Sequence, residues 1–417
     1  MDSQDHQPTR SNHEGEARST PSAGKAVFPE ERSESRFHLG PLLFLTSLFF
    51  LNFISRIVLA PLMPTVEKDL DLTHAQAGSL FLLISLGYFI TLLGSGFVSK
   101  RISHRKTIFA SACLLGVSLM AASLTQGLWG IRFGLLLVGM AAGLYLPSGI
   151  ATLTSFTGPR HWGKALAIHE LAPNLSFVAA PLLSEIFLLW FSWRTILAVL
   201  GAISLGLGIL FARFGKGEDL YGKAPGLDAV KSILSEKAFW IIMVLFSLGI
   251  VGSLGIFTML PLYLVSDHGV HRNWANSLIA LSRLSGLGIA FVSGWISDRL
   301  GPGRTLAAVL FLSGLSTALL GMGPDSWIIA LVFIQPAMAV CFFPPAFAAL
   351  SSIGDPSVRN VAVSITVPAG FVLGGGLVPA GIGLLGDMGR FGTGMALAGG
   401  LILGGSLLAL WLKRFVG

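Results

Sequence analysis

Three arginines lie inside long apolar stretches of this sequence, and they carry its strongest chemical signal. Arg56 stands near the middle of the stretch from Pro41 to Pro64, which holds no other charge, and Arg132 and Arg283 lie in two later stretches. A charge at membrane depth costs from ~2.5 to more than ~10 kcal/mol unless it faces protein or a wet cavity. The arginine fork binds carboxylates and phosphates well. Arg56 therefore predicts a membrane protein whose polar interior receives an anion.

A histidine and an acid stand side by side in another apolar stretch, as His169-Glu170. Glu170 shares a helix face with Asn174, four residues further on. A buried carboxylate that is balanced between desolvation and a nearby arginine can release a proton when an anion takes that arginine. The pair therefore predicts proton coupling. The alternatives are a permanent Glu–Arg strut for Glu170 and a packing role for His169.

Other polar side chains at helix depth are candidates for orienting a substrate: Tyr88, Tyr145, Asn174 and Gln335. Packing is the alternative for the tyrosines. Arg283 predicts a second clamp for the anion, and its alternative is an arginine that snorkels along a groove. Arg132 lies close to one end of its stretch, where a structural or gating role is as reasonable as contact with substrate.

The composition fixes the class of protein that must position these groups. Of the 417 residues, 53% are hydrophobic and 12% are charged, whereas a soluble domain carries about 25% charged residues. The chain is therefore expected to be a polytopic membrane protein. Its net charge of +7 does not indicate a nucleic-acid partner, because the Lys and Arg residues lie mainly in the polar segments between the apolar stretches. Cys113 and Cys341 lie inside apolar stretches, so we expect no disulfide framework, metal site or cofactor.

Twelve apolar segments approach the roughly 20 residues that cross about 30 Å of hydrocarbon. Their backbone must be satisfied internally, and none alternates as a barrel strand does, which predicts an all-α membrane protein. The expected spans are 40–64, 75–98, 107–126, 129–155, 164–190, 193–213, 239–264, 273–297, 304–322, 327–351, 360–385 and 392–413.

Charge placement predicts the orientation. The polar segments on the same side of the membrane as the N-terminus hold sixteen Lys and Arg residues, not counting those of the N-terminal tail. The segments on the opposite side hold four. This positive-inside bias puts both termini in the cytoplasm. Residues 1–38 are rich in Ser, Glu, Arg, Pro and His without apolar periodicity, which predicts a disordered tail.

A polar loop at 214–238 separates two sets of six segments, 39–213 and 239–417. The sets repeat: Gly96 to Thr107 aligns with Gly294 to Thr305 at an offset of 198, with Gly, Ser, Arg and Thr in common. Two six-helix bundles around a central site are typical of a transporter.

The second copy, Gly294-x-x-x-Asp298-Arg299-x-Gly301-x-x-Arg304, resembles the signature loop of the major facilitator superfamily. This resemblance implies twelve helices in two six-helix pseudo-repeats and alternating access. It gives a gating or structural role to Asp298, Arg299 and Arg304, and to Lys100 and Arg101 of the first copy. In the first copy, Lys100 replaces the acid and Ser103 replaces the second glycine. The first copy therefore departs from the signature at the residues expected to make the gating contact.

A second resemblance is to the anion:cation symporters of that superfamily. It rests on Asn52-Phe-Ile-Ser-Arg56, on the helix that begins Arg132-Phe, and on Ala172-Pro173 followed by Ser192-Trp193-Arg194. That branch imports organic and inorganic anions, often with protons. Its acids are replaced by Ser55 and Ala142 here, which leaves Glu170, with His169, to carry protons. The neighbouring fifth and eighth helices also make an Arg283–Glu170 gate possible.

We therefore expect a transporter, not an enzyme, that imports a small organic anion with protons. Its partners would be that anion, protons and the lipid bilayer, and the protein would be a monomer in a bacterial inner or plasma membrane. The alternatives are a proton-driven exporter of drugs or metabolites, which the core arginines disfavour, and an anion sensor without flux. The sequence has no ATP-binding P-loop motif.

Overall fold

The computed structural model describes residues 38–217, 220–222, 226–352 and 359–412, and every element in these ranges is helical. The expected disordered tail lies outside the described residues, apart from His38. The elements, in chain order, are α1 Leu39–Ile57, α2 Leu59–Leu70, α3 His74–Ile102, α4 His104–Ser123, α5 Leu128–Gly143, α6 Tyr145–Phe156, η1 Pro159–His161, α7 Trp162–His169, α8 Leu171–Leu188, α9 Trp193–Phe214, α10 Leu227–Ser235, α11 Lys237–Ile250, η2 Val251–Gly255, α12 Ile256–Ser266, α13 Arg272–Leu300, α14 Pro302–Met322, η3 Asp325–Trp327, α15 Ile328–Val340, α16 Phe343–Leu350, α17 Arg359–Val372, η4 Leu373–Leu377, α18 Val378–Asp387 and α19 Phe391–Leu412.

These helices confirm the predicted all-α membrane fold. Within the described residues, 11 helical runs are long and apolar enough to cross a membrane, and several of them join two shorter helices end to end. With 29 residues, α13 is as long as these runs and completes the pattern of twelve. The predicted span 193–213 corresponds to α9, and 304–322 to α14. Hydropathy thus located the spans to within a few residues at most ends.

Two spans pass through a wider π-helical turn, at η2 and at η4. These two turns pack against each other, and a Cβ on Gly255 of η2 would lie 2.4 Å from the carbonyl oxygen of Gly374 in η4. Only glycine permits that approach. A π turn leaves backbone carbonyls outside the regular α ladder, and such turns are common at functional sites.

The segment that separates the two sets of spans is not wholly a loop. Within the predicted 214–238 linker, α10 forms a helix that packs on α11 and α17. Before it, Leu220 accepts a hydrogen bond from the His104 backbone, and Gly222 donates one to the Ser99 carbonyl. The described parts of the linker therefore contact both sets of spans.

The sequence repeat has a structural counterpart where α3 and α13 end. Ser103 and Gly301, which occupy equivalent positions of the repeat, have φ angles of 74° and 84°. This backbone conformation favours glycine. Ser103 adopts it in the first copy in spite of its side chain, so the replacement noted in the sequence preserves the turn.

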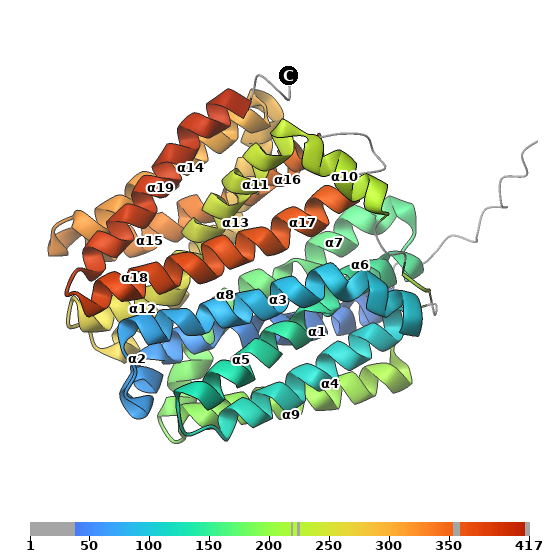
Figure 1. Ribbon diagram of the computed structural model, residues 1–417, viewed down its shortest axis with the longest axis horizontal. Helices are drawn as coiled ribbons and strands as arrows, with labels where there is room; N and C mark the ends of the chain where they lie inside the picture. The colour runs from blue at the N-terminus through green and yellow to red at the C-terminus, as the bar shows by residue number, and fades with distance from the viewer. Residues whose placement is uncertain (1–37, 218–219, 223–225, 353–358, 413–417) are drawn as a thin grey trace, which may run out of the picture. The chain divides into compact units, whose positions relative to one another are not determined.

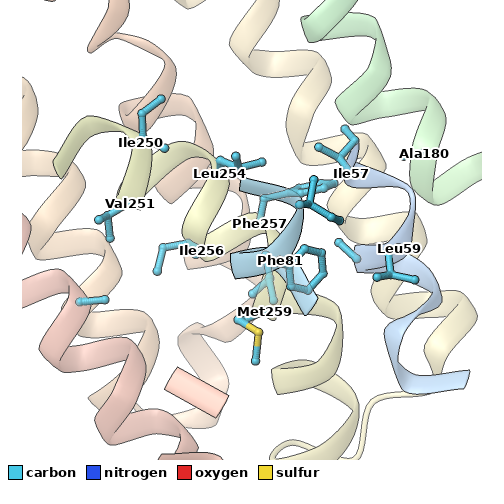
Figure 2. Close-up of a cluster of buried hydrophobic side chains, with 14 of the residues drawn as sticks. Ile57, Leu59, Phe81, Ala180, Ile250, Val251, Leu254, Ile256, Phe257 and Met259 are labelled. Carbon is cyan, nitrogen blue, oxygen red and sulfur yellow. The ribbon is translucent and has the colours of Figure 1, made fainter. Parts of the chain in front are cut away.

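The first six spans (α1–α9) and the last six (α11–α19) meet along an apolar core. In Figure 1, α17 and α18 run beside α3, and these helices are in contact. The core cluster joins both sets, and Figure 2 shows its members from α1, α2, α3 and α8 next to those from α11, η2 and α12: Ile57, Leu59, Phe81, Ala180, Ile250, Val251, Leu254, Ile256, Phe257 and Met259. This interface positions the groups described next.

Candidate functional site

Arg56 lies in the wall of a small cavity between the two sets of spans. We call this the Arg56 cavity. Its wall is contributed by α1, α3, η2, α12, α17 and η4, and it consists of Phe53, Arg56, Ile57, Phe81, Ile84, Ser85, Tyr88, Leu254, Thr258, Phe371 and Gly375. The predicted candidates Arg56 and Tyr88 are thus brought together, although they are far apart in the sequence.

The guanidinium of Arg56 is held by aromatic rings. Its central carbon lies 4.8 Å from the ring centroid of Phe53, 4.3 Å from that of Tyr88 and 5.2 Å from that of Phe371. Such contacts attract a cation to the ring face, the more so where water is excluded. The side chain is only 6% exposed.

These rings leave the charge of Arg56 without an anion. Its Nε has no hydrogen-bond partner, and in the part of the chain that the structure describes no carboxylate forms an ion pair with it. A buried cation without a counter-charge is costly. The cavity therefore offers an anion a strong and unused partner.

Arg283 lies in the wall of a second small cavity, which we call the Arg283 cavity. Its wall is contributed by α8, η2, α13, α15 and α16, and it consists of Asn174, Phe177, Ser253, Arg283, Gly286, Pro336, Val340 and Phe343. The two predicted anion clamps thus line different cavities, and the predicted candidate Asn174 belongs with Arg283. Its amide donates to the carbonyl of Glu170 at 3.1 Å, along the helix face that the sequence predicted.

Arg283 is partly satisfied by the backbone. One of its terminal nitrogens donates to the carbonyl of Ser253 in η2 at 3.1 Å, and its central carbon lies 4.6 Å from the Phe177 ring and 4.9 Å from the Phe257 ring. Its Nε has no hydrogen-bond partner. The possible gate with Glu170 is not formed in this structure, since Arg283 makes these contacts instead.

Three phenylalanines lie between the two arginines. The Phe177 ring is 5.3 Å from Phe53, which lines the Arg56 cavity, and 4.8 Å from Phe257. Phe177 itself lines the Arg283 cavity. The rings therefore form a partition whose two faces each contact one arginine.

Tyr145 and Gln335 line neither of these two cavities. The Tyr145 hydroxyl donates to the Leu45 carbonyl at 2.7 Å, and the Gln335 amide donates to the Gly252 carbonyl of η2 at 2.8 Å. Both side chains satisfy backbone groups in an apolar interior, where unmade hydrogen bonds are costly. Sequence reasoning identified them as buried polar groups but could not tell where they point.

His169 and Glu170 lie where α7 ends and α8 begins. His169 is fully buried, whereas the Glu170 side chain is 57% exposed. The nearest carboxylate oxygen of Glu170 is 3.8 Å from His169 Nδ1, and His169 Nε2 is 3.1 Å from the Tyr145 hydroxyl. The imidazole ring also stacks on Phe49, with centroids 4.4 Å apart.

This geometry fixes the tautomer of a neutral His169. Since the Tyr145 hydroxyl donates its hydrogen to Leu45, its oxygen accepts a hydrogen bond from His169 Nε2–H. The other ring nitrogen, Nδ1, then carries the free lone pair, and it has no hydrogen-bond partner. A proton bound at Nδ1 would lie beside the Glu170 carboxylate, and the charged ring would stack on the face of Phe49.

A polar network closes one end of the interface between the two sets of spans. Arg272 of α13 donates from Nε and a terminal nitrogen to the two carboxylate oxygens of Glu185 in α8, at 3.0 and 3.2 Å. Another nitrogen of Arg272 donates to Thr65 at 3.1 Å, and Asn276 bridges Glu185 and the Pro61 carbonyl at 2.6 and 3.0 Å. No local pattern in the sequence pairs Glu185 with Arg272, because the two residues are 87 positions apart.

A second contact at this end is a helix cap supplied across the interface. Asp387, the last residue of α18, accepts hydrogen bonds from the backbone nitrogens of His74 and Ala75, the first residues of α3, at 2.7 and 3.1 Å. Nearby glycines bring the helices together, because a Cβ on Gly383 would lie 2.1 Å from the His74 carbonyl oxygen. At the opposite end, α6 and α7 pack on helices of the first set, and α16 packs on helices of the last set.

The predicted gating residues lie at several places. Arg132 donates to Ser79 of α3 at 3.2 Å and lies over Trp129, so it braces helices within the first set. Arg299 stacks on Trp295 at 4.0 Å. The remaining members are exposed or partly exposed near the turns that follow α3 and α13: Lys100, Arg101, Asp298 and Arg304.

Known proteins similar to this chain were found by sequence and by structure. The 3-(3-hydroxy-phenyl)propionate transporter of Escherichia coli strain K12 is 23% identical over 359 residues, which cover 80% of this chain and 85% of that protein. The membrane sensor protein UhpC of Salmonella typhimurium is 25% identical over 309 residues, which cover 68% of this chain and 69% of UhpC.

The structural likeness concerns the fold alone. A crystal structure of a bacterial homolog to the human lysosomal transporter Spinster, inward-facing and unoccupied, superposes with a TM-score of 0.77 at 15% identity, covering 91% of this chain and 97% of that one. The family model of the Major Facilitator Superfamily matches residues 45–365, well over half of the sequence. This chain therefore belongs to the Major Facilitator Superfamily of membrane transporters.

Proposed function

We propose that this transporter imports a small organic anion together with protons, by alternating access. The observation that carries the proposal is Arg56, a buried cation without a carboxylate partner in the wall of a cavity to which both sets of spans contribute. A substrate carboxylate would supply the missing counter-charge. The name of the Escherichia coli relative, a transporter of a phenylpropionate, supports an organic acid as the substrate.

The proton would bind at His169 Nδ1. Exposed Glu170 would relay it to the buried ring, and Tyr145 would hold the ring in the tautomer that leaves Nδ1 free. Phe49, Phe53 and Arg56 lie on one face of α1, at spacings of four and three residues. Phe49 stacks on His169 and Phe53 contacts Arg56, so movement of this one helix would link the proton site to the anion site.

The cycle would require the contacts at Glu185 and Asp387 to break when the opposite end closes. With those contacts made, the structure corresponds to a state closed at that end. In the predicted positive-inside orientation, this closed end would face away from the cytoplasm, and both termini would lie on the opposite, cytoplasmic side. The partners of the transporter would be the anion, protons and the lipid bilayer.

The test is uptake by purified protein in liposomes, with a panel of radiolabelled carboxylates, phosphate and cationic drugs. Uptake of one class of anion should be driven by an inward proton gradient. Arg56→Gln should reduce that uptake at least about 30-fold. This factor corresponds to about 2 kcal/mol, the lower end of the cost of removing one partner of a buried charge pair. Arg56→Lys should lie between, because a lysine keeps the charge but loses the fork.

The matched control is Arg213→Gln, which removes an exposed arginine at the end of α9. It should leave uptake unchanged. Proton-driven efflux of cationic compounds that is retained in Arg56→Gln would reject the proposal in favour of a drug exporter.

A second candidate function is favoured by one comparison, since UhpC is named as a sensor. A sensor would bind the same anion at Arg56 without moving it. Thermal stabilisation by an anion, lost in Arg56→Gln, together with no uptake by the same liposomes, would establish this reading instead.

A further inference from the structure

The Arg56 cavity also limits the kind of anion it can hold. We infer that its substrate is a monocarboxylate whose body is a single flat aromatic ring, rather than a sugar acid, a dicarboxylate or inorganic phosphate. This inference rests on the proposed function of the cavity as an anion site.

The charge count of the wall points to a monoanion. Arg56 is the one fully charged residue among the residues that line this cavity. Arg283 cannot serve the same small ligand as a second clamp, because it lies in the other cavity behind the partition of Phe53, Phe177 and Phe257. A second carboxylate would therefore be buried without a partner, which is costly.

The hydrogen-bonding capacity of the wall excludes a ligand with many hydroxyls. Among the lining residues, Ser85, Tyr88 and Thr258 have hydroxyl groups. The Thr258 hydroxyl donates to the carbonyl of Gly255 in η2 at 2.8 Å, so two hydroxyls and the arginine remain. A sugar acid would lose several hydrogen bonds to water and recover few of them.

The aromatic surface of the wall favours a flat ring. Four of the lining side chains are aromatic, from three different helices: Phe53, Phe81, Tyr88 and Phe371. Aromatic rings prefer to pack edge-on or offset against one another, with an attraction beyond that of apolar burial. Such a lining suits an aromatic ring that carries a short acid arm.

The experiment compares probes that share a carboxylate. Binding of benzoate, 3-phenylpropionate, cyclohexanecarboxylate, gluconate, succinate and phosphate to the detergent-purified full chain would be measured by calorimetry. One of the two aromatic acids should bind at least about tenfold more tightly than cyclohexanecarboxylate, gluconate, succinate and phosphate. Its binding should be lost in Arg56→Gln.

A wall variant then tests the ring contact itself. Phe371→Leu keeps an apolar side chain but removes one aromatic face, and it should lower the ratio of aromatic to saturated affinity about fivefold, the size of a ring–ring contact. Phe214→Leu, on an exposed phenylalanine of α9, should leave the ratio unchanged. Because both acids have the same carboxylate, any change at Arg56 cancels in this ratio.

The outcomes separate this inference from the proposed function. Tighter binding of gluconate, succinate or phosphate that depends on Arg56 would overturn the aromatic class and leave an anion transporter. Equal affinity for the saturated and aromatic acids, unchanged in Phe371→Leu, would also overturn it. Binding of no anion in an Arg56-dependent manner would reject both.

Discussion

At the scale of single residues, the candidate anion and proton sites share one property: each keeps a buried nitrogen without a hydrogen-bond partner. Arg56 keeps an unbonded Nε beside a cavity, and His169 keeps an unbonded Nδ1 beside an exposed carboxylate. Tyr145 instead donates to a backbone carbonyl. In an apolar interior, unsatisfied groups are rare and costly, so they indicate function better than burial alone does.

His169 gives a prediction at this scale. His169→Phe keeps a ring that can stack on Phe49 but removes the proton acceptor, so uptake driven by a proton gradient should be lost while anion exchange at equal pH persists. Tyr145→Phe removes the acceptor for Nε2–H and should lower proton-driven uptake about fivefold or more, the effect of one buried hydrogen bond.

The control for that prediction is Tyr263→Phe. The Tyr263 hydroxyl also donates to a carbonyl, that of Leu320, at 2.9 Å, but it lies in the last set of spans, away from His169. If Tyr263→Phe uncoupled uptake as strongly as Tyr145→Phe, the role assigned to His169 would be wrong. Exchange and driven uptake would be compared in the same liposomes.

At the scale of elements, the π turns η2 and η4 connect the cavities. Ser253 of η2 lines the Arg283 cavity, its neighbour Leu254 lines the Arg56 cavity, and Gly375 of η4 faces Leu254 across the turn contact. Arg283 and Gln335 bind the carbonyls of Ser253 and Gly252. The spare carbonyls of a π turn thus serve as attachment points for helices α13 and α15.

Gly255→Ala tests the contact between these turns. A Cβ would lie 2.4 Å from the Gly374 carbonyl oxygen, so we expect a loss of about 1–3 kcal/mol of stability from overpacking, and a lower melting temperature. Gly206→Ala on α9, where a Cβ meets nothing within 4 Å, should be neutral or stabilising by up to about 1 kcal/mol. An unchanged melting temperature in both variants would show that η2 and η4 are not tightly packed.

Much of this architecture could be predicted from sequence, and the reasons are specific. The spans were found because lipid demands about 20 apolar residues in a row, and Arg56 because its charge interrupts such a run. The π turns could not be found, since their register depends on contacts such as Gly255 with Gly374. The separation of Arg56 from Arg283 depends on ring packing between helices far apart in the chain, and it has no local signal.

At the scale of the whole molecule, the Glu185–Arg272 pair joins the first set of spans to the last. Glu185→Gln should weaken this closed end, because Arg272 loses a charged partner, at a cost of about 1–3 kcal/mol. A single cysteine introduced by Met63→Cys, a buried position in α2, should then react with a membrane-impermeant maleimide about fivefold faster or more. The background would lack Cys113 and Cys341.

Asp69→Asn is the matched control for the closed end. Asp69 pairs with Arg194, an ion pair of the same chemistry that lies within the first set of spans. Its loss should leave the labelling rate unchanged. Equal acceleration by both substitutions would mean that general loosening, rather than the contact between the sets, had exposed the cysteine.

The cap that Asp387 gives to α3 also makes the transport cycle visible to isotope exchange. The amide hydrogens of His74 and Ala75 have no partner within their own helix, and here they are bonded to a carboxylate from the last set of spans. Each time the two sets separate at this end, these two hydrogens meet water. Their deuterium uptake therefore counts openings directly, without a label or a mutation, and any ligand that holds this end closed should slow it.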